Sequence, residues 1–231
     1  MLTIGVASQA QSVDAAQAAR KQWLTSGNAN TDPTTNFIGT TDNQPLVFKT
    51  NGKEVMRLGT DGNLTMEDDN LTLKLITISD GNDQSRFEGR RARGVPGAPT
   101  IVQSGDNAVI FRGRGWDGDS YRQLGDIRIR VDGTPGDDDM PGRIEFRTTP
   151  DGDDSSQRRM VIKNTGNVGI GPLSNPQRIL HIDDVMRLEP RVNRPTAAAK
   201  GDIYVDNSGA LCFYDGGSWS VAAGGGNCLD G

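Results

Sequence analysis

The chain has 231 residues, a formal net charge of −5 and a hydrophobic fraction of 34%, with 30 Gly and 11 Pro. So low an apolar fraction does not suit a large monomeric α/β enzyme, and it favours an elongated β protein or an oligomer that buries surface between chains. The acidic balance gives no general footprint for nucleic-acid binding. No apolar run is long enough for a membrane helix, and the first ten residues do not fit an ordinary secretory signal.

The first predicted element is a short α-helix over residues 8–23, SQAQSVDAAQAARKQW, which is rich in Ala and Gln and free of Gly and Pro. Val13, Ala16, Ala19 and Trp23 form a stripe of mostly small residues along it. Two interpretations remain open. The helix packs on the rest of its own chain, or it is an anchor that docks on a neighbouring protein. A polar connector follows it.

From Phe37 onward, short alternating runs are separated by turn dipeptides such as Asn51-Gly52 and Asp61-Gly62. These dipeptides supply the positive φ angles that tight hairpin turns require. Alternation of apolar and polar residues predicts half-buried strands at 71–75 and 127–131. Residues 202–222 indicate a compact meander of three short strands.

An internal repeat relates residues 47–66 to residues 145–170. The second copy has a longer loop, and after that loop the two copies align without a gap. Alternation places equivalent apolar residues on one face of each copy. These residues are Leu46, Phe48, Met56 and Leu58 in the first copy and Ile144, Phe146, Met160 and Ile162 in the second. A small unit used twice indicates modules stacked along an axis, with neighbouring chains completing each unit.

The strings TNFIGTTDNQPLVFKTNGKEVMRLGTDGN and RRMVIKNTGNVGIG resemble a module of bacteriophage tail fibres and related virion fibres. FEGRRARGVPGAPTIVQSGD, FRGRGWDGDSYR and the C-terminal LHIDDVMRLEPRVNRPTAAAKGDIYVDNSGALCFYDGGSWS resemble further parts of the same proteins. The resemblance runs from about residue 34 to residue 221. It implies an all-β, elongated homotrimer whose strands wrap a three-fold axis. It also implies a structural or receptor-contact role in a virion assembled in the host cytoplasm.

With this resemblance, the chain is expected to divide into five segments. They are an N-terminal helix and connector for particle attachment (1–33), a first fibre repeat or shaft (34–66), an inserted β knob (67–141), a second repeat (142–171) and a C-terminal β meander (172–231).

Two groups of residues are candidates for receptor binding. Arg90, Arg91 and Arg93 form ion pairs within the chain or bind an anionic surface glycan, because a guanidinium suits bidentate contact with carboxylate or phosphate. Trp116 and Tyr121 lie in the Gly- and Asp-rich string GRGWDGDSY. They fill the knob's own core, or they stack on sugar rings or pack on an outer-membrane protein. The glycines of that string are expected to shape a loop.

No catalytic residue, cofactor or metal is expected. The acidic runs at 132–139 and 151–154 do not have the spacing of a calcium loop and are interpreted as solvated turn residues. His181 is expected in an ordinary strand. Cys212 is expected as a small buried residue, and Cys228 lies in a Gly-rich tail. A disulfide between the two cysteines is possible, but because virion proteins assemble in a reducing cytoplasm, free thiols are expected before lysis.

The function expected from the sequence is that of a non-enzymatic trimeric tail fibre that contributes to host receptor binding. Its partners would be two further copies of itself, another virion protein contacted through residues 1–33, and a host glycan or outer-membrane protein. Nucleic-acid binding and membrane insertion are not expected. Three alternatives remain open: a head fibre or capsid decoration protein, a bacterial surface adhesin, and a glycan-degrading tailspike.

Overall fold

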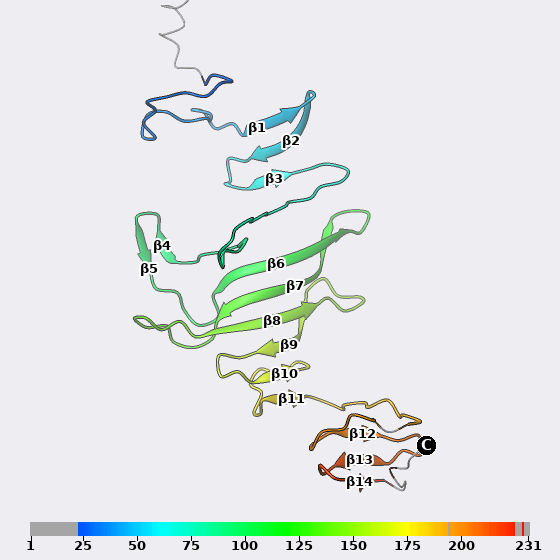
Figure 1. Ribbon diagram of the computed structural model, residues 1–231. Helices are drawn as coiled ribbons and strands as arrows, with labels where there is room; N and C mark the ends of the chain where they lie inside the picture. Colours follow the sequence, from blue (N-terminus) through cyan, green and yellow to red (C-terminus); the bar gives the residue numbers. More distant parts are fainter. Residues whose placement is uncertain (1–22, 194, 225–227, 229–231) are drawn as a thin grey trace, which may run out of the picture. The chain divides into compact units, whose positions relative to one another are not determined.

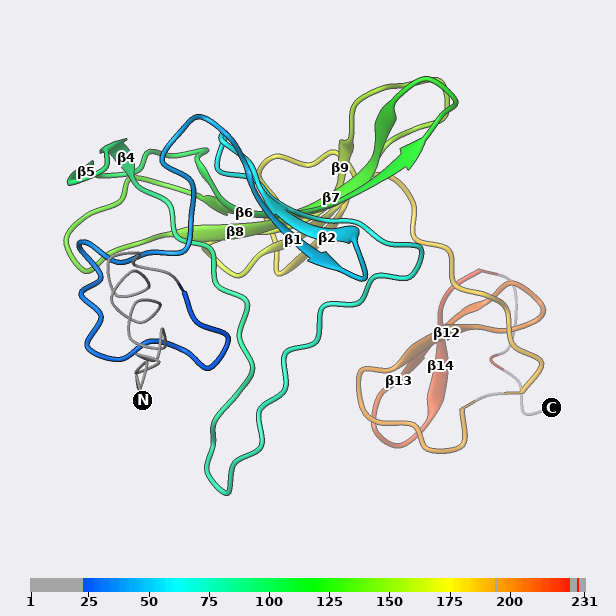
Figure 2. The same ribbon diagram turned by 90° about the horizontal axis from the view of Figure 1, so that it is seen from above.

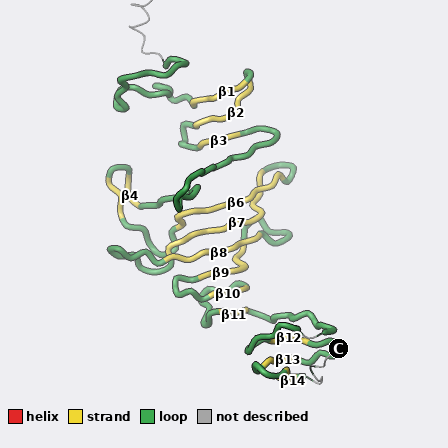
Figure 3. Tube along the Cα trace, in the orientation of Figure 1, coloured by secondary structure: helices red, strands yellow, loops and turns green. Residues whose placement is uncertain are grey.

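A computed structural model of the chain describes residues 23–193, 195–224 and 228. These residues form strands and loops and no helix (Figure 3), which confirms the all-β fold class. Accordingly, they contain no helix that could cross a membrane. All but the last residue of the helix predicted over residues 8–23 lies outside the described part. The chain divides into two compact units, Met1–Arg86 and Phe87–Gly231.

The first unit contains a three-stranded antiparallel meander in the order β1-β2-β3 (Figure 1). Its strands are β1 (Leu46–Thr50), β2 (Lys53–Leu58) and β3 (Leu64–Met66). The turn between β1 and β2 has positive φ at both Asn51 (49°) and Gly52 (76°), as the dipeptide predicts. Gly62, in the second turn, has a φ of 80°. Both predicted hairpins are confirmed.

The strand predicted at residues 71–75 is wrong. The structure assigns no strand between β3 and residue 93, and Leu71, Leu73 and Leu75 are exposed. Figure 2 shows residues 67–86 (teal) as a long loop that runs out and back. Among the described residues, no strand lies beside residues 71–75 to pair with their backbone N–H and C=O groups. The preference of this segment for an extended strand is therefore not realised.

The second unit contains a six-stranded sheet in the order β11-β10-β9-β8-β7-β6 (Figure 1). Neighbouring strands are antiparallel except β10 and β11, which are parallel. The strands are β6 (Asn107–Trp116), β7 (Tyr121–Val131), β8 (Gly142–Thr148), β9 (Gln157–Ile162), β10 (Val168–Ile170) and β11 (Leu180–Ile182). A separate hairpin joins β4 (Arg93–Val95) and β5 (Ala98–Thr100).

The internal repeat appears as two meanders of the same register, β1-β2-β3 and β8-β9-β10. Phe48 lies opposite Met56 in the first, and Phe146 lies opposite Met160 in the second. Each meander has a bulge directly after that Phe. The predicted alignment of the two copies is therefore confirmed. The five expected segments stay a prediction, and β7 and β8 pair across the expected division between residues 141 and 142.

The two faces of the second-unit sheet differ in chemistry and in burial. Ile127, Ile129 and Phe146 share the apolar face, and each keeps between 36% and 40% of its surface exposed. On the opposite face, Glu145 and Val161 are fully buried. The described residues therefore cover the apolar face only in part, for example where Phe87 packs against Phe111.

A third meander, β12-β13-β14, follows near the C-terminus, as predicted. Its strands are β12 (Ile203–Val205), β13 (Leu211–Tyr214) and β14 (Trp219–Ala223). A small hydrophobic core lies here, formed by Tyr204, Ala210, Cys212 and Cys228, with Trp219 packed against it. In the described part of the chain, the other buried hydrophobic residues are Val102, Val131 and Val161.

Candidate functional site

The tip of the β6–β7 hairpin carries the two aromatic candidates. Trp116 and Tyr121 are directly paired across the strands, and their ring centroids lie 5.3 Å apart in an edge-on arrangement. The two residues are 61% and 63% exposed, so they do not fill a core of their own chain. An exposed edge-on pair offers flat apolar surface for stacking or packing by a partner.

The turn between these two residues is held by the Asp117 carboxylate. It accepts hydrogen bonds from the backbone N–H groups of Ser120 (2.8 Å) and Asp119 (2.9 Å) and from Nε of Arg122 (2.8 Å). These contacts, the Ser120 N–H first, hold the pKa of Asp117 well below its ordinary value. The tip is thus fixed by charge-assisted hydrogen bonds beside the exposed rings.

The three arginine candidates lie elsewhere. Arg93 makes two contacts of 2.7 and 2.8 Å with Asp106, and the Arg93 hydrogen bonds hold the pKa of Asp106 well below its ordinary value. Arg90 pairs with Glu88 at 2.8 Å on the surface, and Arg91 donates to the Ala92 carbonyl.

Asp106 precedes the first residue of β6, whereas Trp116 is its last. A ten-residue strand spans about 30 Å, so the structure does not bring the two groups of candidates together.

Sequence reasoning missed a charged cluster on the second-unit sheet. Asp132 was expected as a solvated turn residue, and this expectation is wrong. Its buried carboxylate lies 2.8 Å from Nη1 of Arg143, contacts Nζ of Lys163 and accepts the Asn164 backbone N–H at 3.1 Å. Burial alone would raise the pKa of Asp132, but the hydrogen bonds from Lys163 and Asn164 lower it below the ordinary value.

Glu145 is the centre of this cluster. Its carboxylate lies 2.7 Å from Arg143, 3.2 Å from Arg147, 3.3 Å from Arg130 and 3.7 Å from Arg158. Burial raises the pKa of Glu145, but the hydrogen bond from Arg143 and the surrounding charges outweigh it, so the pKa lies below its ordinary value. Asp126, buried nearby, is held by Arg128 through contacts of 2.6 and 2.8 Å.

The glycines of the string GRGWDGDSY do not all shape a loop, which corrects that expectation. Gly113 and Gly115 lie within β6, and only Gly118 lies in the turn, with a φ of 106°. Gly113 pairs with Gly125 on the neighbouring strand, and the missing side chains leave a hollow of about 460 Å³. Phe111, Ile127 and Phe146 are among the side chains that line it.

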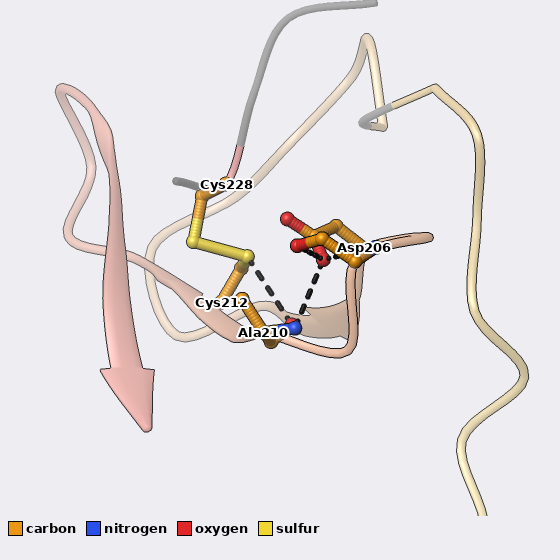
Figure 4. The surroundings of a disulfide bond; sticks show 5 residues. Asp206, Ala210, Cys212 and Cys228 are labelled. Carbon is orange, nitrogen blue, oxygen red and sulfur yellow. Dashed lines mark hydrogen bonds between the residues drawn. A yellow bond between two sulfur atoms is a disulfide. The ribbon is translucent and has the colours of Figure 1, made fainter. Parts of the chain in front are cut away.

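The two cysteines form a disulfide (Figure 4), which is the alternative to the free thiols expected before lysis. Cys212 on β13 is buried as predicted, and its Cα lies 5.6 Å from that of Cys228, which is also buried. Next to this bond, the Asp206 carboxylate accepts the Ala210 N–H at 2.9 Å and orders the β12–β13 turn.

His181 lies in β11, as expected, and its Nδ1 accepts the Gln177 N–H at 3.2 Å. Within the described ranges, no group of His, Cys, Asp and Glu side chains is arranged to hold a metal ion. Tyr214 and Trp219 form a second aromatic pair, 5.2 Å apart, beside an open hollow of about 410 Å³.

No protein-family model matches the chain, and no curated protein matches it. Among solved structures, it is similar in fold to the carboxy-terminal domain of the bacteriophage T5 L-shaped tail fibre. The identity is 14% and the TM-score 0.43, over 71% of this chain and 76% of that one. The same domain with its intramolecular chaperone domain gives 16% identity and a TM-score of 0.45, over 73% of this chain and 56% of that one.

Proposed function

We propose that the chain is a non-enzymatic subunit of a homotrimeric tail fibre of a phage or phage-like particle. The observation that carries the proposal is the repeated meander with the same apolar face uncovered in both copies. Phe48 keeps 39% of its surface exposed and the equivalent Phe146 keeps 36%. In a monomer, each face would leave apolar surface open to water of the kind that soluble monomers rarely carry.

Two further copies of the same chain are the occupants that fit these faces. The repeat preserves the apolar positions in both meanders, as expected when successive modules meet equivalent neighbours around one axis. The resemblance of the repeat strings to tail-fibre modules also implies a homotrimer. The small core of a single chain is consistent with a fold whose stability is shared between subunits.

Host contact is assigned to the tip of the β6–β7 hairpin. Trp116 and Tyr121 present exposed rings on a turn fixed by the Asp117 carboxylate. Such a tip suits a surface glycan or an outer-membrane protein, since aromatic residues dominate the binding energy of many interfaces.

Attachment to the particle is assigned to residues 1–33, which lie outside the fibre resemblance. Deletion of residues 1–22 should leave a chain that assembles but no longer joins the particle. Incorporation at the normal level would contradict this assignment. The deletion ends before Trp23 because the Trp23 indole N–H donates to the Phe37 carbonyl at 2.7 Å.

Immunogold labelling of intact particles with an antibody against the chain tests the proposal. Gold on fibres that extend from the tail is the expected result. Gold on the capsid would favour a head fibre or decoration protein, and gold on the surface of uninfected bacteria would favour an adhesin. Release of reducing sugar ends from host polysaccharide by the purified chain would instead indicate a tailspike hydrolase.

A further inference from the structure

On the charged face of the second-unit sheet, negatively charged side chains are buried and positively charged side chains lie around them nearer the solvent. Three carboxylates lie at its base, and their side chains are 0–5% exposed; they belong to Asp126, Asp132 and Glu145. Seven cationic side chains surround them and stay 15–31% exposed; they belong to Arg112, Arg128, Arg130, Arg143, Arg147, Arg158 and Lys163. The cluster therefore carries four more positive than negative charges, and solvent meets almost only the cations, in a chain whose net charge is −5.

The strand register places two pairs of like charges directly opposite each other. Arg130 lies opposite Arg143 across β7 and β8, and Arg147 lies opposite Arg158 across β8 and β9. Directly opposed like charges destabilise a sheet. Glu145 contacts all four guanidinium groups, but a single carboxylate balances only one of the four charges. Asp132 also contacts Arg143, and Arg130, Arg147 and Arg158 donate to backbone carbonyls. These carbonyls carry no net charge, so the three carboxylates of the cluster leave four of its seven cations without a compensating negative charge.

The first copy of the repeat provides an internal comparison. There, the pair equivalent to Arg147 and Arg158 consists of Lys49 and Glu54, which have opposite charges. The position equivalent to Glu145 is Val47. Both copies keep the apolar face, so the meander does not need cations on its other face. The first copy therefore lacks both the opposed arginine pair and the buried carboxylate of the second copy.

We propose that this face, formed by β6 to β9 and here called the cationic face, binds an anionic polysaccharide. Its guanidinium groups match carboxylate, phosphate or sulfate groups in geometry and charge. Strands about 4.8 Å apart carry cations in rows, which suits a polymer with repeated negative charges better than a single small anion. Only the assignment of this polymer to a host cell surface rests on the proposed function.

The cationic face is distinct from the hairpin tip and from the apolar face. Arg112, the most exposed of its cations at 31%, lies on β6 opposite Asp126. Because Arg112 approaches Asp126 only to 4.0 Å, while Arg128 contacts it at 2.6 Å, the Arg112 charge can be removed without leaving a buried carboxylate unpaired.

Affinity chromatography and titration of the full chain with defined polymers test the proposal. Dextran sulfate, polygalacturonate and inorganic polyphosphate represent sulfate, carboxylate and phosphate, and neutral dextran is the control. We expect binding to at least one polyanion, weaker at higher salt because screening acts on exposed charges, and no binding to dextran. The polymer bound most tightly identifies the anionic group.

The variants Arg112→Gln and Arg158→Gln should each weaken polyanion binding about fivefold or more. The matched control is Arg159→Gln, which removes the same charge from the next residue of β9 and should leave binding within about twofold. The Arg159 guanidinium donates to Thr148 Oγ1 and lines the hollow of Ile127 and Phe146, on the apolar side of the sheet. Arg112→Gln keeps the test decisive if loss of Arg158, which donates to Pro172 and Ser174, impairs folding.

Equal losses in Arg112→Gln and Arg159→Gln, or no polyanion binding by the folded wild-type chain, would overturn the assignment. Tighter binding of duplex DNA than of any polysaccharide at matched charge would overturn the choice of ligand. Light scattering on the same samples reports the oligomer, so a failure of this site is distinguishable from a failure of the fibre proposal.

Discussion

Phe146 on β8 faces Met160 on β9 across a pair of strands that bulges immediately after Phe146. Phe48 and Met56 make the same pair, with the same bulge, in the first unit. Both pairs lie on faces that one chain leaves partly open. The repeated geometry therefore connects a pattern in the sequence to a surface for assembly.

The first prediction concerns Leu58, which lies on this apolar face and is 44% exposed in one chain. If neighbouring copies cover it, Leu58→Asp buries an unpaired charge and should cost several kcal/mol of assembly stability, about 3 kcal/mol. Thr60→Asp, two residues away in an exposed turn, should cost less than about 0.5 kcal/mol. Denaturant unfolding of both variants measures the difference, and equal costs would mean that the face is not an interface.

The second prediction concerns acid. The pKa values of Asp126, Asp132 and Glu145 are lowered in the folded chain, by hydrogen bonds and charges that outweigh burial. Groups with a depressed folded pKa contribute stability that is complete above their unfolded pKa, about 4 to 4.5, and is lost as the pH falls through the folded pKa. The unfolding temperature should therefore decline below about pH 4.5. A constant value down to pH 2.5 would contradict this.

Glu145→Gln tests the centre of the charged cluster. Removing one partner of a buried ion pair typically costs about 3–5 kcal/mol, and here it also leaves two opposed arginine pairs without their shared carboxylate. Glu54→Gln is the matched control, because Glu54 pairs with Arg57 near the surface and its loss should cost less than about 1 kcal/mol. Thermal or denaturant unfolding compares the two, and an equal effect would show that the cluster does not stabilise the sheet.

The sequence predicted those parts of the fold that depend on local pattern. Asn51-Gly52 predicted its turn. Alternation of apolar and polar residues predicted the apolar face of each repeat copy, on which Phe48 and Phe146 occupy equivalent positions. The pattern at residues 71–75 was equally clear but gave no strand, because a strand depends on a partner that local sequence does not specify. Alternation placed Glu145 on the polar face of its strand, but it did not reveal that four arginines from three strands surround this carboxylate. That arrangement depends on the register of β7, β8 and β9, which is a non-local property.

For the candidate sites too, local sequence predicted some features and missed others. Trp116 and Tyr121 could be predicted because a Gly- and Asp-rich string marks a turn, and the structure adds that the two rings pair directly. The pairing of Cys212 and Cys228 was missed. The expectation of free thiols rested on the cellular compartment, and sequence alone did not reveal that the tail returns to β13.

The disulfide gives a fourth prediction. It joins residues 16 positions apart, and closing a loop of this size is worth about 3 kcal/mol in the chain-entropy account. Reduction, or the double variant Cys212→Ala with Cys228→Ala, should lower the unfolding transition of β12–β14. Tryptophan fluorescence can report this through Trp219, which packs on that core, provided that the other two tryptophans are replaced. Dithiothreitol should have no further effect on the double variant, and an unchanged wild-type transition on reduction would refute the stabilising role.

The hairpin tip gives a fifth prediction. Trp116→Ala with Tyr121→Ala should leave the oligomer and its unfolding temperature nearly unchanged, because both rings are more than half exposed. Adsorption to host cells should fall by about tenfold or more if the rings are binding anchors. A loss of stability in the double variant would indicate that the two rings have a structural role. If adsorption and stability both persist, Tyr214 and Trp219 become the next residues to test.

The central claim is that three chains assemble and cover one another's exposed apolar faces. The mass of the purified chain in solution tests this claim most directly. Multi-angle light scattering should give about three times the 24.8 kDa of one chain, and the mass should persist on dilution through the micromolar range. A monodisperse, folded species of 24.8 kDa would contradict the account.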